Sequence, residues 1–169
     1  MHRRLRVLVL ALVVVAGLAV FAAGSAVAAN AVTLVGTING GGTAQMEDGM
    51  GTTHWGAGIK LYSDGTASGS FDCVDQHGDA PGYPGNIWGK VTNWSVDANG
   101  VVSLSVVGKF LSIPGGHPVA AEFVVRIQQF GGAGVGHWTL EVGGTLDTAG
   151  FIVCYEILTS GQIVARWSS

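Results

Sequence analysis

Apolar and polar residues alternate over short stretches of the chain after residue 30, and glycine separates these stretches. A period of two places one face of an extended strand on a core and the other face in water. No stretch after residue 30 sustains a helical period. The pattern therefore predicts an antiparallel all-β domain of eight or nine strands, either a β-sandwich or a small up-and-down β-barrel. We expect the strands at residues 31–38, 54–63, 66–75, 86–98, 101–111, 119–130, 135–143, 151–158 and 162–168.

Two dipeptides, Asp64-Gly65 and Asn99-Gly100, are typical of two-residue hairpin turns, in which glycine supplies a positive φ. Counting outward from Asp64-Gly65 places His54 opposite Asp75 on one face. The ideal register around Asn99-Gly100 pairs two lysines, at 90 and 109, which is unfavourable. We therefore expect a β-bulge in that hairpin.

The glycine loop at 131–134 joins two strands whose register can be tested against the sequence. Apolar residues then face apolar residues, as Ile127 faces Trp138, and the opposite face pairs Gln128 with His137. Both His-Trp dipeptides, at 54–55 and 137–138, should send the indole into the core and leave the imidazole outside.

Residues 1–28 have the layout of a secretory signal peptide: a basic start, a long apolar run and small residues at Ala26-Val27-Ala28. The length of the run leaves an uncleaved membrane anchor as an alternative. With cleavage, residues 29–169 form a single secreted domain with no stable membrane insertion, and 141 residues can build an adequate core.

Charge is sparse in this exported part. Three of the eight basic residues lie in the leader, so five basic and eleven acidic side chains remain, a net charge of −6. The lysines and arginines occur singly, which disfavours nucleic-acid binding.

Both cysteines, Cys73 and Cys154, lie in the exported part. In an oxidising compartment such a pair predicts a disulfide, and closing so long a loop contributes on the order of 4 kcal/mol. A metal–thiolate site is the weaker interpretation because no C-x-x-C spacing exists.

The stretch FDCVDQHGD at 71–79 contains the residues whose side chains are best suited to metal binding or catalysis. Asp75, His77 and Asp79 alternate, so they project to one side and can offer carboxylate oxygens and an imidazole to a divalent metal such as zinc or manganese. His54, Asp75 and His77 also form a candidate catalytic set, with His54 as a general base. The simpler alternative is a polar turn that ends a strand.

Aromatic residues suggest a different role. Tyr83 and Trp88, flanked by glycine and proline, are candidates for exposed rings that contact a glycan or other small ligand, together with the polar side chains of Gln128 and His137. The first hypothesis is thus a secreted, extracellular binding domain. The alternatives are a small secreted hydrolase or lyase that uses the His/Asp site with or without a metal, and a surface or matrix protein that assembles through exposed β edges. The sequence leaves the oligomeric state open.

The motifs GGGTA at 40–44, DGTASGSFDC at 64–73 and SGQIV at 160–164 resemble those of a loose group of small secreted bacterial β proteins without an assigned activity. The resemblance implies export and an all-β fold, and it carries over no catalytic residue.

Overall fold

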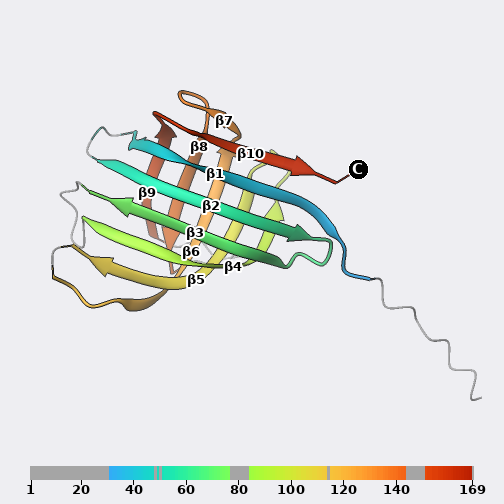
Figure 1. The fold of residues 1–169 in the computed structure, drawn as a ribbon, viewed down its shortest axis with the longest axis horizontal. Coiled ribbons are helices and arrows are strands. Elements are labelled where there is room, and N and C mark those ends of the chain that lie inside the picture. Colours follow the sequence, from blue (N-terminus) through green and yellow to red (C-terminus); the bar gives the residue numbers. More distant parts are fainter. Residues whose placement is uncertain are drawn as a thin grey trace, which may run out of the picture. The chain divides into compact units, whose positions relative to one another are not determined.

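The structure is a computed structural model that describes residues 31–47, 49, 51–76, 84–113, 115–143 and 151–168. The chain divides into two units, Met1–Ala31 and Val32–Ser169. In its described part the second unit consists of strands and turns, so the predicted all-β class is confirmed (Figure 1). No helix in these ranges is long and apolar enough to cross a membrane. The predicted signal segment lies outside the described residues.

Antiparallel pairing joins the ten strands of the described residues into one sheet, and eight of them close into a barrel in the order β2-β3-β4-β5-β6-β8-β9-β1, with β1 returning to β2. The barrel, and not the sandwich, is therefore the correct alternative. The strands are β1 Leu34–Met46, β2 Thr52–Tyr62, β3 Ala67–Asp75, β4 Gly85–Val96, β5 Val102–Ser112, β6 Val119–Gln129, β7 Gly131–Gly132, β8 His137–Val142, β9 Phe151–Leu158 and β10 Gln162–Trp167.

Strand β1 closes the barrel. One of its edges pairs with β2 over almost its whole length. Its other edge is shared, because residues 44–46 pair with β9 while residues 36–41 pair with the additional strand β10. Figure 1 shows β10 beside β1, with the short strand β7 near the start of β10.

Inward-facing side chains fill the barrel. Trp55, Phe71 and Trp138 contact one another at its centre, with ring centroids 5.5–6.5 Å apart. Trp55 and Trp138 are buried, whereas His54 is exposed and His137 is half-buried, which confirms the predicted orientation of both dipeptides. An eight-stranded barrel leaves an interior that such side chains can fill completely.

The prediction ended the first strand at residue 38, but β1 continues through three glycines to Met46. The prediction left these glycines outside any strand, whereas in the structure they allow the backbone of β1 to approach its neighbours closely. A Cβ on Gly40 would lie 2.5 Å from Cη2 of Trp55 and 2.7 Å from the carbonyl oxygen of Gln162. β1 can therefore pass between β2 and β10 only without a side chain at this point.

The predicted register of the β2–β3 hairpin is wrong by one residue. The backbone N–H of Tyr62 donates to the oxygen of Thr66 at 3.0 Å, so the loop has three residues, and Gly65 has φ of +82°. The shift places Thr53 opposite Asp75 and His54 opposite a valine. A slip of one residue sends every side chain of a strand to the other face relative to its expected neighbour.

The other two hairpins follow the prediction more closely. β4 has the expected bulge, between Val91 and Asn93, and the two lysines face Val107 and Trp88 instead of each other. In the β6–β8 hairpin Ile127 faces Trp138 as predicted. The expected Gln128–His137 pair is wrong, since a further bulge brings Gln129 opposite His137.

Gly40→Ala tests the tight passage of β1. The added methyl group must displace an indole or a backbone carbonyl, so we expect the free energy of unfolding in urea to fall by about 1–3 kcal/mol. Gly56→Ala on β2 is the matched control, because a Cβ there meets no atom within 4 Å. Equal stability of the two variants would contradict the close packing.

Candidate functional site

The structure separates the predicted catalytic residues His54 and Asp75. His54 lies on the outer face of β2, where its Nδ1 is 3.4 Å from the hydroxyl of Thr43. Asp75 is 3% exposed and lines a cavity inside the barrel. The expected His54–Asp75 contact is therefore wrong, because the β2–β3 register is shifted by one residue from the predicted one. His77, Asp79 and Tyr83 lie outside the described residues.

Polar side chains meet inside one end of the barrel. Asp75 and Glu156 are both buried, and the hydroxyl of Thr53 donates to Oε2 of Glu156 at 2.5 Å. The cavity that they line holds about 10 Å³, which is close to the space of a single water molecule. In the described ranges no group of three His, Cys, Asp or Glu side chains is arranged to hold a metal ion. A substrate does not fit here.

Cys73 and Cys154 line the same cavity from β3 and β9. The predicted disulfide is not formed in the structure, where both are buried free thiols. Burial, followed by the negative charge of Glu156, holds the pKa of each thiol well above its usual range. Asp75 adds to this effect at Cys73, and Cys73 adds to it at Cys154.

These raised pKa values predict inert thiols in the folded, reduced protein, because the thiolate is the reactive form. We expect both cysteines to react with a thiol reagent at neutral pH only as fast as the protein unfolds. Reaction should accelerate sharply in denaturant. The reaction can be monitored by absorbance. Rapid labelling of the native protein would contradict the burial of the two cysteines.

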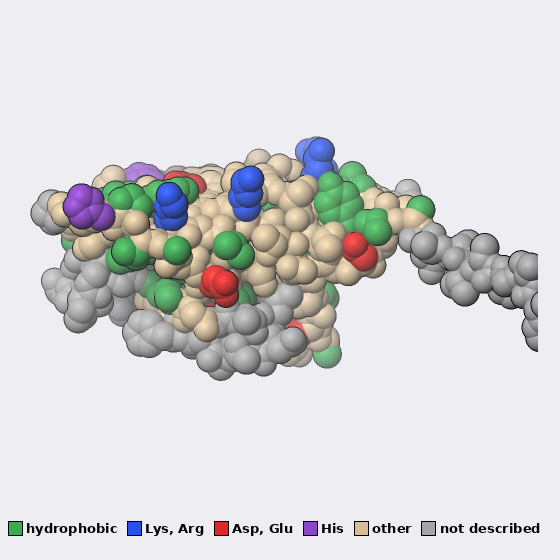
Figure 2. All heavy atoms as spheres, turned by 90° about the horizontal axis from the view of Figure 1, so that it is seen from below, with side chains coloured by type: hydrophobic (Ala, Val, Ile, Leu, Met, Phe, Trp, Pro, Cys, Tyr) green, Lys and Arg blue, Asp and Glu red, His purple; other side chains and the backbone are tan. Residues whose placement is uncertain are grey.

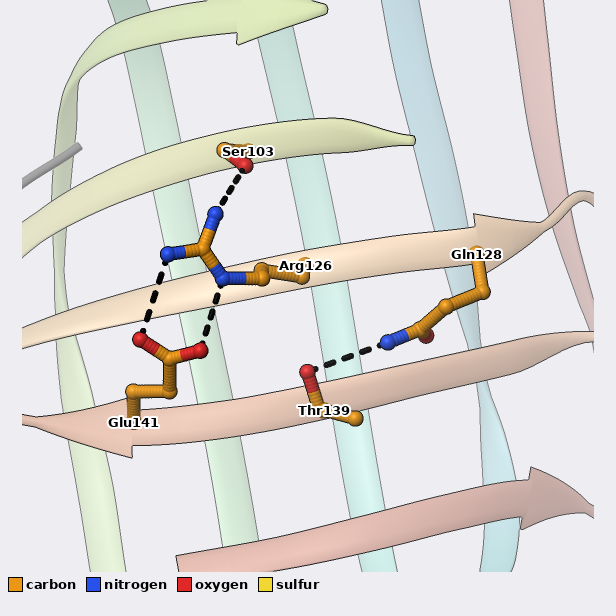
Figure 3. Close-up of polar contacts among 5 residues, drawn as sticks. All are labelled: Ser103, Arg126, Gln128, Thr139 and Glu141. Carbon is orange, nitrogen blue, oxygen red and sulfur yellow. Dashed lines mark hydrogen bonds and ion pairs between the residues drawn. The ribbon is translucent and has the colours of Figure 1, made fainter. Parts of the chain in front are cut away.

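Polar side chains form hydrogen bonds on the outer face of β5, β6 and β8 (Figure 3). Arg126 on β6 donates from Nε and Nη2 to the two carboxylate oxygens of Glu141 on β8, at 2.7 and 3.2 Å. Its Nη1 donates to the hydroxyl of Ser103 on β5 at 2.8 Å. The amide of Gln128 donates to the hydroxyl of Thr139 at 3.1 Å.

The network fixes the relative positions of three strands. Glu141 is only 6% exposed, so its carboxylate needs the paired guanidinium. The hydrogen bond with Glu141 raises the pKa of Arg126 above its usual value, although partial burial acts in the opposite direction. Bidentate pairs of this kind are geometrically specific as well as strong.

Arg126→Met removes the guanidinium and leaves the Glu141 carboxylate buried without it. We expect the free energy of unfolding to fall by about 1–3 kcal/mol. The double variant Arg126→Met/Glu141→Leu should recover most of this loss, because the uncompensated charge is gone. Additive losses in urea denaturation would show that the ion pair is not the cause.

Next to this network, a bulge on β9 creates an exposed surface. Cys154 faces Leu140, but Ile152 faces Glu141, so Val153 is the extra residue. Because of it, Ile152 lies on the same outer face as Tyr155, and the two have 39% and 49% of their surface exposed. Bulges often redirect side chains in this way beside functional sites.

These two residues line an open groove of about 420 Å³ together with Met46 and Glu47. Glu47 is held in two ways: its N–H donates to the backbone oxygen of Tyr155 at 2.9 Å, and its Oε1 is 2.6 Å from Nε2 of His137. An aromatic ring and an anchored carboxylate thus lie at one groove, which we call the Tyr155 groove.

Of the four predicted ligand-binding residues, His137 lies on β8, next to this groove, and Gln128 lies one strand further away on β6. His137 is on β8 and contacts Glu47, and Thr139, the partner of Gln128, faces Tyr155 in the register. Trp88 is elsewhere. It is half-buried on β4 between Asp72 and Lys109.

Tyr155 and Glu47 were missed in the sequence analysis. Tyr155 was read as one alternating position in a regular strand, and the position of Ile152 on the same face depends on a bulge for which the sequence has no turn residue. Glu47 follows a glycine-rich stretch that the prediction left outside any strand.

Comparison of the chain with protein-family models, with curated proteins and with solved structures finds no match.

Proposed function

We propose that this protein is an exported binding domain that holds a glycan, or another small ligand rich in hydroxyl groups, in the Tyr155 groove. The observation that carries this proposal is an exposed tyrosine beside a carboxylate that a histidine holds at 2.6 Å, in an open groove of about 420 Å³. Ligand pockets in proteins commonly measure about 300–1,000 Å³.

The side chains of the groove match the chemistry of a sugar. The ring of Tyr155 offers a flat apolar face for the C–H groups of a pyranose, and its hydroxyl can donate or accept a hydrogen bond. Glu47 accepts hydrogen bonds from ligand hydroxyls when ionised. Ile152 adds apolar surface at the groove.

Preorganisation favours binding at this place. Binding loses free energy when side chains must be ordered. Glu47 is already fixed by its backbone and side-chain contacts, and the Arg126 network holds β6 and β8 behind it. The groove therefore needs little rearrangement to receive a ligand.

Other ligand classes are less compatible with this structure. The cavity between Asp75 and Glu156, in the described part of the barrel, is too small for a lipid. Figure 2 shows one face on which the Lys and Arg side chains lie apart from one another, a poor surface for a phosphate backbone. The enzyme hypothesis loses its His54–Asp75 contact, since these residues lie on opposite faces of the wall.

Export and oxidation belong to the same proposal. Residues 1–28 would direct the chain out of the cell, and Cys73 and Cys154, which line one cavity, would form their disulfide in an oxidising compartment during folding. The intact mass of protein recovered from the medium tests both expectations, through loss of the leader and of two hydrogen atoms.

Tyr155→Ala tests the groove. In affinity electrophoresis through a panel of soluble polysaccharides, we expect the natural protein to be retarded by at least one of them. Tyr155→Ala should weaken that retardation about tenfold, and Tyr155→Phe should keep most of it because the ring remains.

Trp88→Ala is the control, since it removes an aromatic ring from another strand of the same barrel. Loss of retardation in Trp88→Ala with normal binding in Tyr155→Ala would move the site to β4. If the natural protein is retarded by none of the polysaccharides, the glycan proposal is wrong.

A further inference from the structure

Strand β10 has one closed edge and one open edge. Along its closed edge, residues 162–167 pair with residues 41–36 of β1. Along the other edge, β7 covers only Gln162 and Ile163. No other described residue pairs with residues 164–167, so β10 is an edge strand of the described sheet.

The backbone groups that face the open edge can be identified. The N–H of Ser168 donates to the oxygen of Val35 at 2.9 Å. Hydrogen-bonded pairs alternate along an antiparallel ladder, so Arg166 and Val164 also bond to β1. The N–H and C=O groups of Ala165 and Trp167 therefore point away from β1, toward the open edge.

This edge lacks two of the features that usually protect a strand from pairing, proline and a β-bulge. Residues 164–167 contain no proline and no bulge, and their single charge is Arg166. Among the described residues no ion pair involves Arg166. An open groove of about 560 Å³ lies over the closed β1–β10 pair, and its lining includes Asn39, Gln162 and Arg166.

We propose that the open edge of β10 binds an extended peptide segment of another protein, which adds as an antiparallel strand and carries an acidic side chain opposite Arg166. The four backbone groups of Ala165 and Trp167 supply the ladder, as in other cases of strand addition. Arg166 supplies selectivity, because opposite charges directly across a ladder are favourable and like charges are not. This peptide site is separate from the Tyr155 groove.

A second copy of the same chain meets an obstacle in two of the central registers of this edge. In a symmetric dimer, β10 of one copy would pair antiparallel with β10 of the other, related by a two-fold axis normal to the sheet. Residues that lie opposite each other in such a ladder must face the same side of the sheet. A register centred on Ala165 needs Trp167 opposite Ile163, whose edge β7 already occupies. A register centred on Arg166 brings two guanidinium groups together, which is unfavourable. An acidic segment of a different chain meets neither obstacle.

The test uses capped synthetic peptides and backbone amide NMR spectra of the protein. The probe has alternating threonine and valine with one central glutamate, and its two controls carry lysine at the centre or N-methylated backbone amides. We expect the glutamate peptide to shift the amide signals of residues 164–168. The lysine peptide should bind about tenfold more weakly, and the N-methylated peptide should cause no shift there.

Two variants separate recognition from folding. Ala165→Pro removes an N–H that points to the open edge and leaves the β1 hydrogen bonds in place, a position where proline is tolerated. It should keep the thermal midpoint of the natural protein and lose the glutamate peptide. Ala165→Val is the matched control and should bind normally. Arg166→Glu should reverse the preference, so that the lysine peptide binds better.

Three results would overturn the proposal. They are the absence of shifts at residues 164–168 with every peptide, equal binding of the N-methylated peptide, and an unchanged preference in Arg166→Glu. Light scattering gives a fourth: a dimer that disappears in Ala165→Pro would assign the edge to a second copy.

Discussion

The fold depends on the contact between the indole of Trp55 and the bare backbone of β1 at Gly40. β1 pairs with β2 on one side and with β9 and β10 on the other. It can do so only because Gly40 has no Cβ, which would collide with the indole of Trp55 and the backbone oxygen of Gln162. Because β1 fits there, the sheet closes and its hydrophobic face is enclosed. The same contact brings Trp55 against Phe71 and Trp138, which fill the centre.

A filled and closed barrel determines where chemistry can occur. In the described part of the interior, Asp75, Glu156 and the two thiols surround a cavity with space for about one water molecule. The binding sites that we propose therefore lie on the outer wall. There, the bulge at Val153 and the open edge of β10 interrupt the regular ladder, and these are the two places at which we propose binding.

The sequence predicted much of the fold because period-two patterns and turn glycines are local signals. The inward tryptophans and the Ile127–Trp138 register followed from them. What failed depended on single residues: a three-residue loop instead of two at Gly65 moved Asp75 away from His54, and one bulge placed Ile152 on the same outer face as Tyr155. Loop length and bulges are decided by packing across the barrel, which alternation along one strand does not record.

Hydrogen exchange resolved by residue would test the closure of the barrel by β1 most directly. Amides in a strand that is paired along both edges exchange only in the largest unfolding event. Our account predicts that the amides of residues 37–41 exchange as slowly as any in the protein, while those of Ala165 and Trp167 exchange quickly. If residues 37–41 exchange as quickly as that open edge, β1 does not close the barrel and the account is wrong.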